Sequence, residues 1–279
     1  MRARAFLIVL LAAFALTAQA QFSLNLNKLI STVKKVQQAS SEVDQPQEVA
    51  LGRDVAARLL GAAPLVPDER LQRYVNNVGR WLALHTERPG LPWHFGVLDT
   101  DTVNAFATPG GNVFLTRGLY VRLRSEAELA GVLAHEISHV LRKHHLTAMQ
   151  KNARTGLAAD ALALALADRG NSEARNKLIS AGTELYARGL DKSDELEADR
   201  LGVVIAARAG YDAYGLPAVL QTLEAMNPQD SGLALMFKTH PAPAERLDAL
   251  EKTMQPTLER YAALPDLAAR FAAAASGKN

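Results

Sequence analysis

The chain has 279 residues, of which 48% are hydrophobic and 22% are charged, and it contains no cysteine. This is the composition of an ordinary globular chain that is long enough to bury a core. It excludes a disulfide framework and a lipid-modified N-terminal cysteine. The formal net charge is only +2, so the charge balance does not point to nucleic acid as a partner.

The N-terminus has the composition of a secretory signal peptide. Arg2 and Arg4 precede an apolar run over residues 5–16, and small residues follow where a cleavage site requires them. The alternative is a retained membrane anchor, although the run is shorter than the roughly 20 residues that a spanning helix needs. We expect a mature chain that starts near Gln21 and is periplasmic. Without Arg2 and Arg4 it has 29 basic and 29 acidic residues and is formally neutral.

Helical patterns follow this segment. Residues 24–39 are weakly amphipathic and predict a surface helix, and residues 48–60 place apolar side chains at helical spacing. Residues 67–84 predict another helix, because Pro67-Asp68-Glu69 is typical of a helix start. We expect these helices to form scaffold.

A β-like pattern comes next. Residues 93–99 alternate as a strand does, and residues 104–107 and 112–116 flank the turn sequence Pro109-Gly110-Gly111. We therefore predict a strand followed by a hairpin. An edge strand can bind an extended peptide as an added strand, and the alternative is a hairpin with only a structural role. The predicted substrate-binding edge strand consists of Asn112, Val113, Phe114 and Leu115.

The segment His135-Glu136-Ile137-Ser138-His139 is an H-E-x-x-H motif. It lies in a predicted helix that starts at the capping box Ser125-Glu126-Ala127-Glu128 and runs beyond His144. Residues four apart share one helix face, so His135 and His139 can present two imidazoles to one zinc ion. Glu136 can then take a proton from the attacking water and deliver it to a leaving amine, as zinc-dependent peptide hydrolysis requires.

A catalytic zinc site needs a third protein ligand, and two candidates compete for this place. His145 has the spacing of the third histidine in H-E-x-x-H-x-x-G-x-x-H, but Arg142 replaces the glycine at which the helix would break, so we expect His145 to point away. Glu195 and Asp199 lie four apart on a second predicted helix. One can bind zinc while the other holds a ligand histidine in its tautomer. The alternative for this acidic helix is a solvated face.

The remaining segments carry weaker signals. Residues 155–167 are rich in alanine and leucine and predict a packed helix, with a lid or a membrane-touching flap as the alternative. His240 lies in an extended loop from which it can stabilise an oxyanion or fill the fourth position of the metal; the alternative is a structural loop. Arg246 is a second candidate for anion stabilisation. Residues 254–275 predict one or two packing helices.

Four blocks of residues resemble the gluzincin zinc peptidases that include HtpX, BepA and the CAAX prenyl endopeptidase. The blocks are Asn104–Ala107 with Pro109–Gly111, His135–His139, Glu195–Asp199, and Thr239–Pro241 with Arg246-Leu247. The resemblance implies that His135, His139 and Glu195 bind one zinc ion per chain. It further implies that Glu136 is catalytic and that Asp199 supports a ligand histidine.

The sequence also departs from these relatives. Members often carry Ser-Arg before the ligand glutamate, whereas this chain has Asp191-Lys192, and lysine does not copy the planar fork of arginine. HtpX-like and CAAX-type members span the membrane several times, and BepA-like members extend into helical repeats. This sequence shows neither pattern and is most similar to stand-alone periplasmic members.

We therefore expect an α+β fold, a mostly helical zincin-like domain with a small β-sheet beside the motif helix. The expected function is a zinc endopeptidase that acts on misfolded or unassembled envelope proteins, including outer-membrane proteins. Contact with the membrane surface is left open. The alternative is a zinc-stabilised binding or chaperone-like module without turnover. The predicted division of the chain is a signal peptide at 1–20, an N-terminal helical extension at 21–45, a metallopeptidase domain at 46–252 and a C-terminal helical tail at 253–279.

Overall fold

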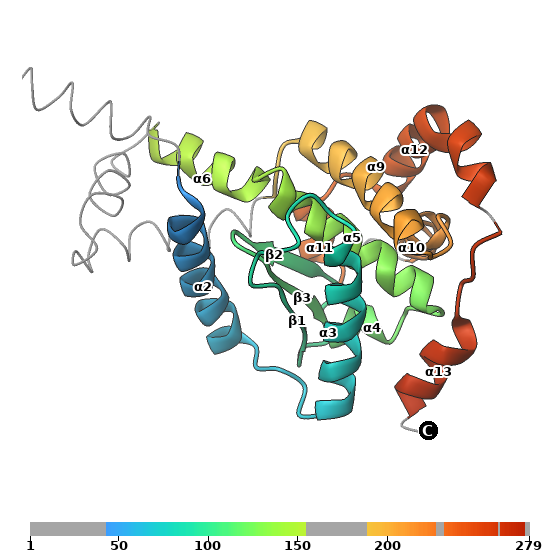
Figure 1. The fold of residues 1–279 in the computed structure, drawn as a ribbon, viewed down its shortest axis with the longest axis horizontal. Coiled ribbons are helices and arrows are strands. Elements are labelled where there is room, and N and C mark those ends of the chain that lie inside the picture. The colour runs from blue at the N-terminus through green and yellow to red at the C-terminus, as the bar shows by residue number, and fades with distance from the viewer. Residues whose placement is uncertain (1–42, 155–188, 227–231, 262, 277–279) are drawn as a thin grey trace, which may run out of the picture.

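The computed structural model describes residues 43–154, 189–226, 232–261 and 263–276 (Figure 1). Within these ranges, helices pack around a three-stranded sheet, which confirms the predicted α+β class. None of the described helices combines the length and the apolar composition needed to cross a bilayer. The predicted signal peptide and the predicted helix at 155–167 lie outside the described residues.

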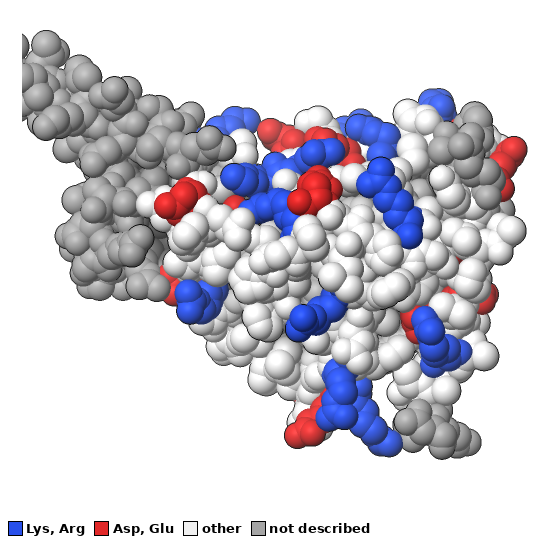
Figure 2. All heavy atoms as spheres, in the orientation of Figure 1, with Lys and Arg blue, Asp and Glu red and all other residues white. Residues whose placement is uncertain are grey.

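The surface of this fold is mixed in charge. Figure 2 shows that basic and acidic side chains are interspersed on the face seen in Figure 1, with broad uncharged areas between them. Figure 1 places α2 at one end of the molecule and α12 and α13 at the other.

Helices α2 (Gln45–Ala62) and α3 (Glu69–Leu84) confirm the two predicted scaffold helices. Each helix begins after an aspartate that caps it. Asp44 accepts a hydrogen bond from the backbone N–H of Gln47 at 2.8 Å, and Asp68 accepts one from that of Arg70 at 2.9 Å. These bonds satisfy donors that a helix start leaves unpaired. The apolar face of α3 then packs against the sheet.

The sheet contains β1 (His94–Leu98), β2 (Ala105–Thr108) and β3 (Asn112–Thr116) in the order β1-β3-β2. β3 pairs in parallel with β1 and antiparallel with β2. The prediction that residues 112–115 form an edge strand is therefore wrong, because both edges of β3 are occupied by neighbouring strands. The residues concerned are Asn112, Val113, Phe114 and Leu115. β2 is the edge strand that packs against the motif helix.

The motif helix is α5 (Glu126–Leu141), and every one of its residues is buried. Ser125 caps it as predicted, accepting a hydrogen bond from the backbone N–H of Glu128 at 3.1 Å. The prediction that the helix runs beyond His144 is wrong. Lys143 has a φ of 56°, a left-handed conformation that few residues other than glycine adopt. α6 (His144–Arg154) therefore starts as a separate helix.

The remaining helices close the fold around α5. They are α4 (Arg117–Tyr120), α9 (Lys192–Arg208), α10 (Gly215–Glu224), α11 (Ala234–Thr239), α12 (Pro243–Leu258), the 3₁₀ helix η1 (Glu259–Tyr261) and α13 (Ala268–Ser276). The last of these confirms a packing helix in the tail. On α13, Phe271 packs against the rings of Tyr74 and Tyr120, with centroids 6.4 and 5.2 Å away. The predicted boundary between residues 252 and 253 falls inside α12.

Helices α5 and α9 approach each other closely because small residues line their contact. A Cβ atom added at Gly202 would lie 2.9 Å from the backbone nitrogen of His135 and 3.0 Å from its Cα. Only glycine allows two backbones to come this near. Ala198 lies one turn earlier on the same face and is fully buried. Glu195 is two turns before Gly202, so the close approach brings its carboxylate to the motif histidines.

We predict that Gly202→Ala lowers the free energy of unfolding by about 1–3 kcal/mol, because the added methyl group overpacks the α5–α9 contact. Gly61→Ala is a matched control, since a Cβ there meets nothing within 4 Å. This control is expected to stabilise α2 by about 0.5–1 kcal/mol. Urea unfolding of both variants measures the difference, and equal effects at the two glycines would contradict the tight contact.

Candidate metal centre

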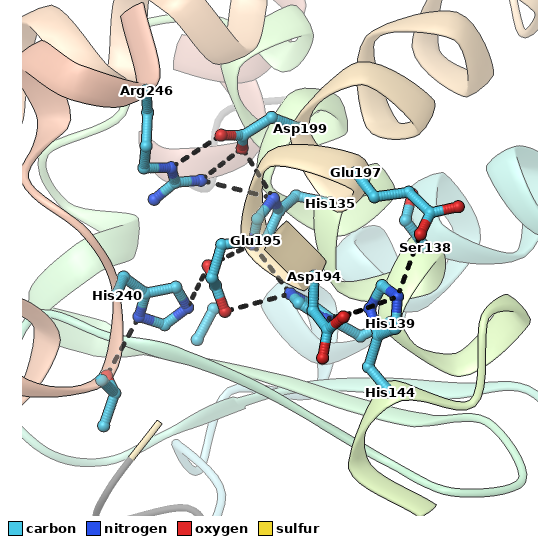
Figure 3. Close-up of polar contacts among 12 residues, drawn as sticks. His135, Ser138, His139, His144, Asp194, Glu195, Glu197, Asp199, His240 and Arg246 are labelled. Atoms are coloured by element: carbon cyan, nitrogen blue, oxygen red, sulfur yellow. Dashed lines mark hydrogen bonds and ion pairs between the residues drawn. The ribbon is translucent and has the colours of Figure 1, made fainter. Parts of the chain in front are cut away.

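Three side chains from α5 and α9 direct donor atoms at one point (Figure 3). The Nε2 atoms of His135 and His139 are 3.1 Å apart. The carboxylate oxygens of Glu195 lie 3.6 Å from them, Oε2 from His135 and Oε1 from His139. Ligand atoms about 2.0–2.1 Å from one tetrahedral ion are about 3.3–3.4 Å apart. The spacing therefore matches a site that closes around a single metal ion.

The Glu195 carboxylate supports the same conclusion. Its residue is 1% exposed, and its Oε2 atom has no hydrogen-bond partner among the described residues. A buried carboxylate oxygen without a partner is costly, and a cation between Glu195 and the two imidazoles would satisfy it. Two imidazoles and one carboxylate also form a donor set that catalytic metal sites use with one position left open. The residues present thus fit a divalent metal.

Protonation states in the centre favour a cation. Burial opposes the charge on Glu195, but His240, His139 and His135 outweigh burial and hold the pKa of this carboxyl well below its usual range. Burial keeps the pKa of His139 well below its ordinary value, so this imidazole is neutral, as a metal ligand must be. Burial and Arg246 lower the pKa of His135, but Asp199 and Glu195 raise it to about 9. At neutral pH the metal-free centre therefore carries a proton on His135, and a bound metal ion would displace that proton.

Asp199 orients the first ligand from behind. Its Oδ1 lies 2.9 Å from Nδ1 of His135, which turns Nε2 of that ring toward the centre. Arg246 on α12 donates to both oxygens of Asp199, from Nε at 2.9 Å and from Nη2 at 2.5 Å. Burial raises the pKa of the Asp199 carboxyl, but Arg246 and His135 hold it below its ordinary value. The supporting role of Asp199 stays a prediction, and these contacts are the ones it requires.

Glu136 and His240 lie beside the centre, as the sequence predicts. Glu136 is 3% exposed, and burial raises its pKa to about 7. The Nε2 atom of His240 is 3.7 Å from Oε2 of Glu195, and its Nδ1 is 3.0 Å from Oγ1 of Thr239. Both residues line one small cavity with Ala105 and Phe106 of β2. Their predicted chemical roles, and anion stabilisation by Arg246, remain predictions.

Sequence reasoning missed His144. Its Nδ1 atom is 3.0 Å from Nδ1 of His139, and the residue is 6% exposed. A helix continuing through residue 144 would have carried this side chain to another face. Because the helix breaks at Lys143, the His144 side chain lies on the same side as His139. The one sequence signal was the presence of two more histidines just after the motif.

His145 is close to the centre for the same reason. Its ring centroid is 5.4 Å from that of His139, and burial lowers its pKa to about 3. The expectation that an unbroken helix points it away is therefore wrong. Its ring nitrogens are nevertheless absent from the described groups of donors that lie within 4.8 Å of one another. Glu195 is the third member of the ligand group.

A helix that carries H-E-x-x-H and is crossed by a second helix that supplies a glutamate defines a zincin-like metallopeptidase domain. Residues 69–254 match peptidase family M48. The chain belongs to this family, whose members depend on a bound metal.

Two relatives show how far the similarity extends. The chain is 34% identical over 225 residues to the beta-barrel assembly-enhancing protease of Escherichia coli (strain K12), an alignment that covers 78% of this chain and 46% of that protein. It is 30% identical over 182 residues to the mitochondrial metalloendopeptidase OMA1 of Schizosaccharomyces pombe, covering 64% of this chain and 52% of that protein. The chain thus spans about half the length of these relatives.

We predict that metal removal destabilises the protein. A ligand at 100 times its dissociation constant adds about 2.7 kcal/mol to the free energy of unfolding, so saturating zinc is expected to raise Tm over that of chelator-treated protein. Glu195→Gln removes one charged ligand and is expected to lose most of this gain, whereas Glu224→Gln on the exposed end of α10 keeps it. Thermal unfolding with and without zinc measures the gain. If zinc raises the Tm of Glu195→Gln as much as that of the parent, Glu195 is not a metal ligand.

We predict that the Asp199–Arg246 pair is required for stability as a pair. Arg246→Met leaves the buried Asp199 with His135 as its only remaining charged partner among the described residues and is expected to lower the free energy of unfolding by up to about 3–5 kcal/mol. The double variant Asp199→Asn/Arg246→Met removes the stranded charge and is expected to lose less than Arg246→Met alone. Urea unfolding of the metal-free proteins at pH 7 tests this order. Simple additivity of the two substitutions would show that the charges do not interact.

Proposed function

We propose that this chain is a zinc endopeptidase that hydrolyses peptide bonds in misfolded or unassembled cell-envelope proteins. The supporting observation is the convergence of His135, His139 and Glu195 with Glu136 beside them. Zinc is the metal proposed because two imidazoles and one carboxylate, with the fourth position open, are the ligand set of known catalytic zinc sites in peptidases. When bound, zinc polarises the scissile carbonyl and lowers the pKa of the attacking water.

Glu136 is the proposed general base and general acid. Its pKa of about 7 lets the carboxylate both accept and release a proton near neutral pH. It takes a proton from the attacking water as the water oxygen bonds to the scissile carbon. It then delivers that proton to the amine nitrogen as the carbon–nitrogen bond breaks. Burial of Glu136 keeps bulk water from competing for the proton.

β2 replaces β3 as the proposed substrate-binding strand. One edge of β2 pairs with β3, and its other side packs toward α5, where Ala105 and Phe106 share a cavity with Glu136. A peptide that extends the sheet at β2 would be held mainly by main-chain hydrogen bonds. Such binding is loosely specific for sequence, which suits an enzyme that removes misfolded chains.

An apolar hollow next to the centre is the proposed place for a substrate side chain. It borders His135, Glu136, His240 and Arg246, and its remaining wall is mostly aliphatic. That wall consists of Leu119, Val132, Leu216, Val219, Leu220, Leu223 and Met236 together with Asn104 and Ala105. An apolar substrate residue would bury its surface here. His240 and Arg246 border the same hollow and are the proposed stabilisers of the oxyanion.

The proposed location is the periplasm. Arg2 and Arg4 followed by the apolar run at 5–16 support export by a signal peptide. The name of the Escherichia coli relative, which refers to enhancing β-barrel assembly, supports outer-membrane proteins as substrates. The proposed catalytic domain extends over residues 46–252 and includes α2, and α13 packs against its helices α3 and α5.

We predict that Glu136→Gln lowers the rate of casein hydrolysis about 10²–10⁴-fold, because a positioned general base contributes about that much. Zinc content is expected to stay the same, since the substitution leaves the group His135, His139 and Glu195 intact, although Glu136 also lies in a second group of donors with His135 and His240. Glu69→Gln on the exposed start of α3 is the control and is expected to keep full activity. If the parent binds zinc but neither the parent nor the control cleaves protein, the chain is a zinc-stabilised binding module.

A further inference from the structure

His144 lies behind the second imidazole of the metal centre. Its ring meets that of His139 edge to face, with centroids 5.1 Å apart and an interplanar angle of 70°. The contact joins Nδ1 to Nδ1 at 3.0 Å (Figure 3). This is hydrogen-bond distance, so one of the two nitrogens donates and the other accepts.

The metal centre decides which nitrogen donates. The Nε2 atom of His139 points to the ligand group, 3.1 Å from His135 Nε2 and 3.6 Å from Glu195 Oε1. A neutral imidazole that binds a metal through Nε2 carries its proton on Nδ1. His139 is therefore the donor. His144 must accept through Nδ1, which places its own proton on Nε2.

The surroundings of His144 agree with this tautomer. Its Nε2 atom faces two carboxylates of α9, 3.5 Å from Oε2 of Glu197 and 3.9 Å from Oδ1 of Asp194. Both carboxylates attract the positive end of an N–H group. Arg142 binds the other oxygen of Glu197 at 3.0 Å and holds that carboxylate near His144. His144 thus lies between His139 and two carboxylates of α9, bonded to the first and in electrostatic contact with the others.

The backbone between the two histidines is built for this contact. Successive residues of an α-helix turn by about 100°, so a residue five positions after His139 would face about 140° away in a continuous helix. Lys143 interrupts the helix with its φ of 56° and returns residue 144 to the same side. The left-handed conformation is unfavourable in a residue other than glycine. The His139–His144 contact is one of the contacts that this conformation allows.

We propose that His144 is a positioning residue that fixes the tautomer and the orientation of His139, with Glu197 and Asp194 fixing His144 in turn. The inference rests on the proposed metal site. Most ligand histidines donate their second N–H to a carboxylate or a backbone carbonyl. Here the acceptor is the imidazole of His144. The carboxylates of Glu197 and Asp194 contact His144 and not the ligand His139.

The test is the zinc affinity of the full chain, measured by competition with a chromogenic chelator. His144→Leu removes the acceptor and is expected to weaken zinc binding 10–100-fold, the usual effect of losing such a partner. His144→Asn keeps an oxygen acceptor near the position of Nδ1 and is expected to restore most of the affinity. His94→Leu changes an exposed histidine at the start of β1 and is expected to bind zinc as the parent does. The visible absorption of the cobalt-substituted protein is expected to shift in His144→Leu and not in His94→Leu.

Parental zinc affinity and an unshifted cobalt spectrum in His144→Leu would overturn the proposal. So would equal weakening in the leucine and asparagine variants, because a purely structural role gives no rescue by an acceptor. If the leucine variant does not fold, His144→Gln replaces it, because the side-chain oxygen of glutamine lies near the position of Nε2 rather than that of Nδ1. Equal zinc affinities of the Asn and Gln variants would then overturn the proposal. These readouts need no turnover. A parent that binds zinc without cleaving protein defeats the proposed function and leaves this inference standing.

Discussion

The close approach of α9 to α5 is the constraint on which the metal centre depends. Gly202 lets the two backbones meet beside His135, and this sets the distance between the Glu195 carboxylate and the imidazoles. α5 is held equally tightly from another side. A Cβ at Gly131 would lie 2.6 Å from the backbone nitrogen of Leu216, and one at Gly215 would lie 2.1 Å from the carbonyl of Ala127. The motif helix is thus fixed by backbone contacts, which do not shift as side chains do.

This rigid frame explains how so many charges are buried together. Glu195, Asp199 and Arg246 are each 5% exposed or less, and isolated charges would be costly at this depth. They are tolerated because each faces an opposite charge or an imidazole at a fixed distance. Arg246 neutralises Asp199 from α12, and His135 lies between Asp199 and Glu195. α12 is therefore part of the centre, although it is remote from the motif in sequence.

Much of this arrangement could be predicted from local patterns. The spacing of four in His135–His139 and in Glu195–Asp199 puts each pair on one helix face, and the structure places each pair as that spacing requires. Capping residues located the starts of α3 and α5. Two features could not be read locally. The first is the parallel pairing of β1 with β3, which are separated in sequence by β2. An alternating pattern identifies a strand but does not show which strand it pairs with.

The second feature is the break after Leu141. Arg142 and Lys143 both favour helix, so no local signal marked the end. Tertiary contacts decide it: Arg88 lies 3.4 Å from the carbonyl of Val140, and Arg142 pairs with Glu197 of α9. These contacts between distant parts of the chain outweigh the local helix propensity. They place His144 beside His139, which is why sequence reasoning missed it.

The order of the ligands along the chain also bears on biosynthesis. His135 and His139 leave the ribosome well before Glu195, because α6 and residues 155–188 separate the two helices. Domains are completed only when their distant parts have been made. A half-made chain therefore holds two imidazoles without their carboxylate partner, and the metal joins a centre that forms only once translation has passed α9.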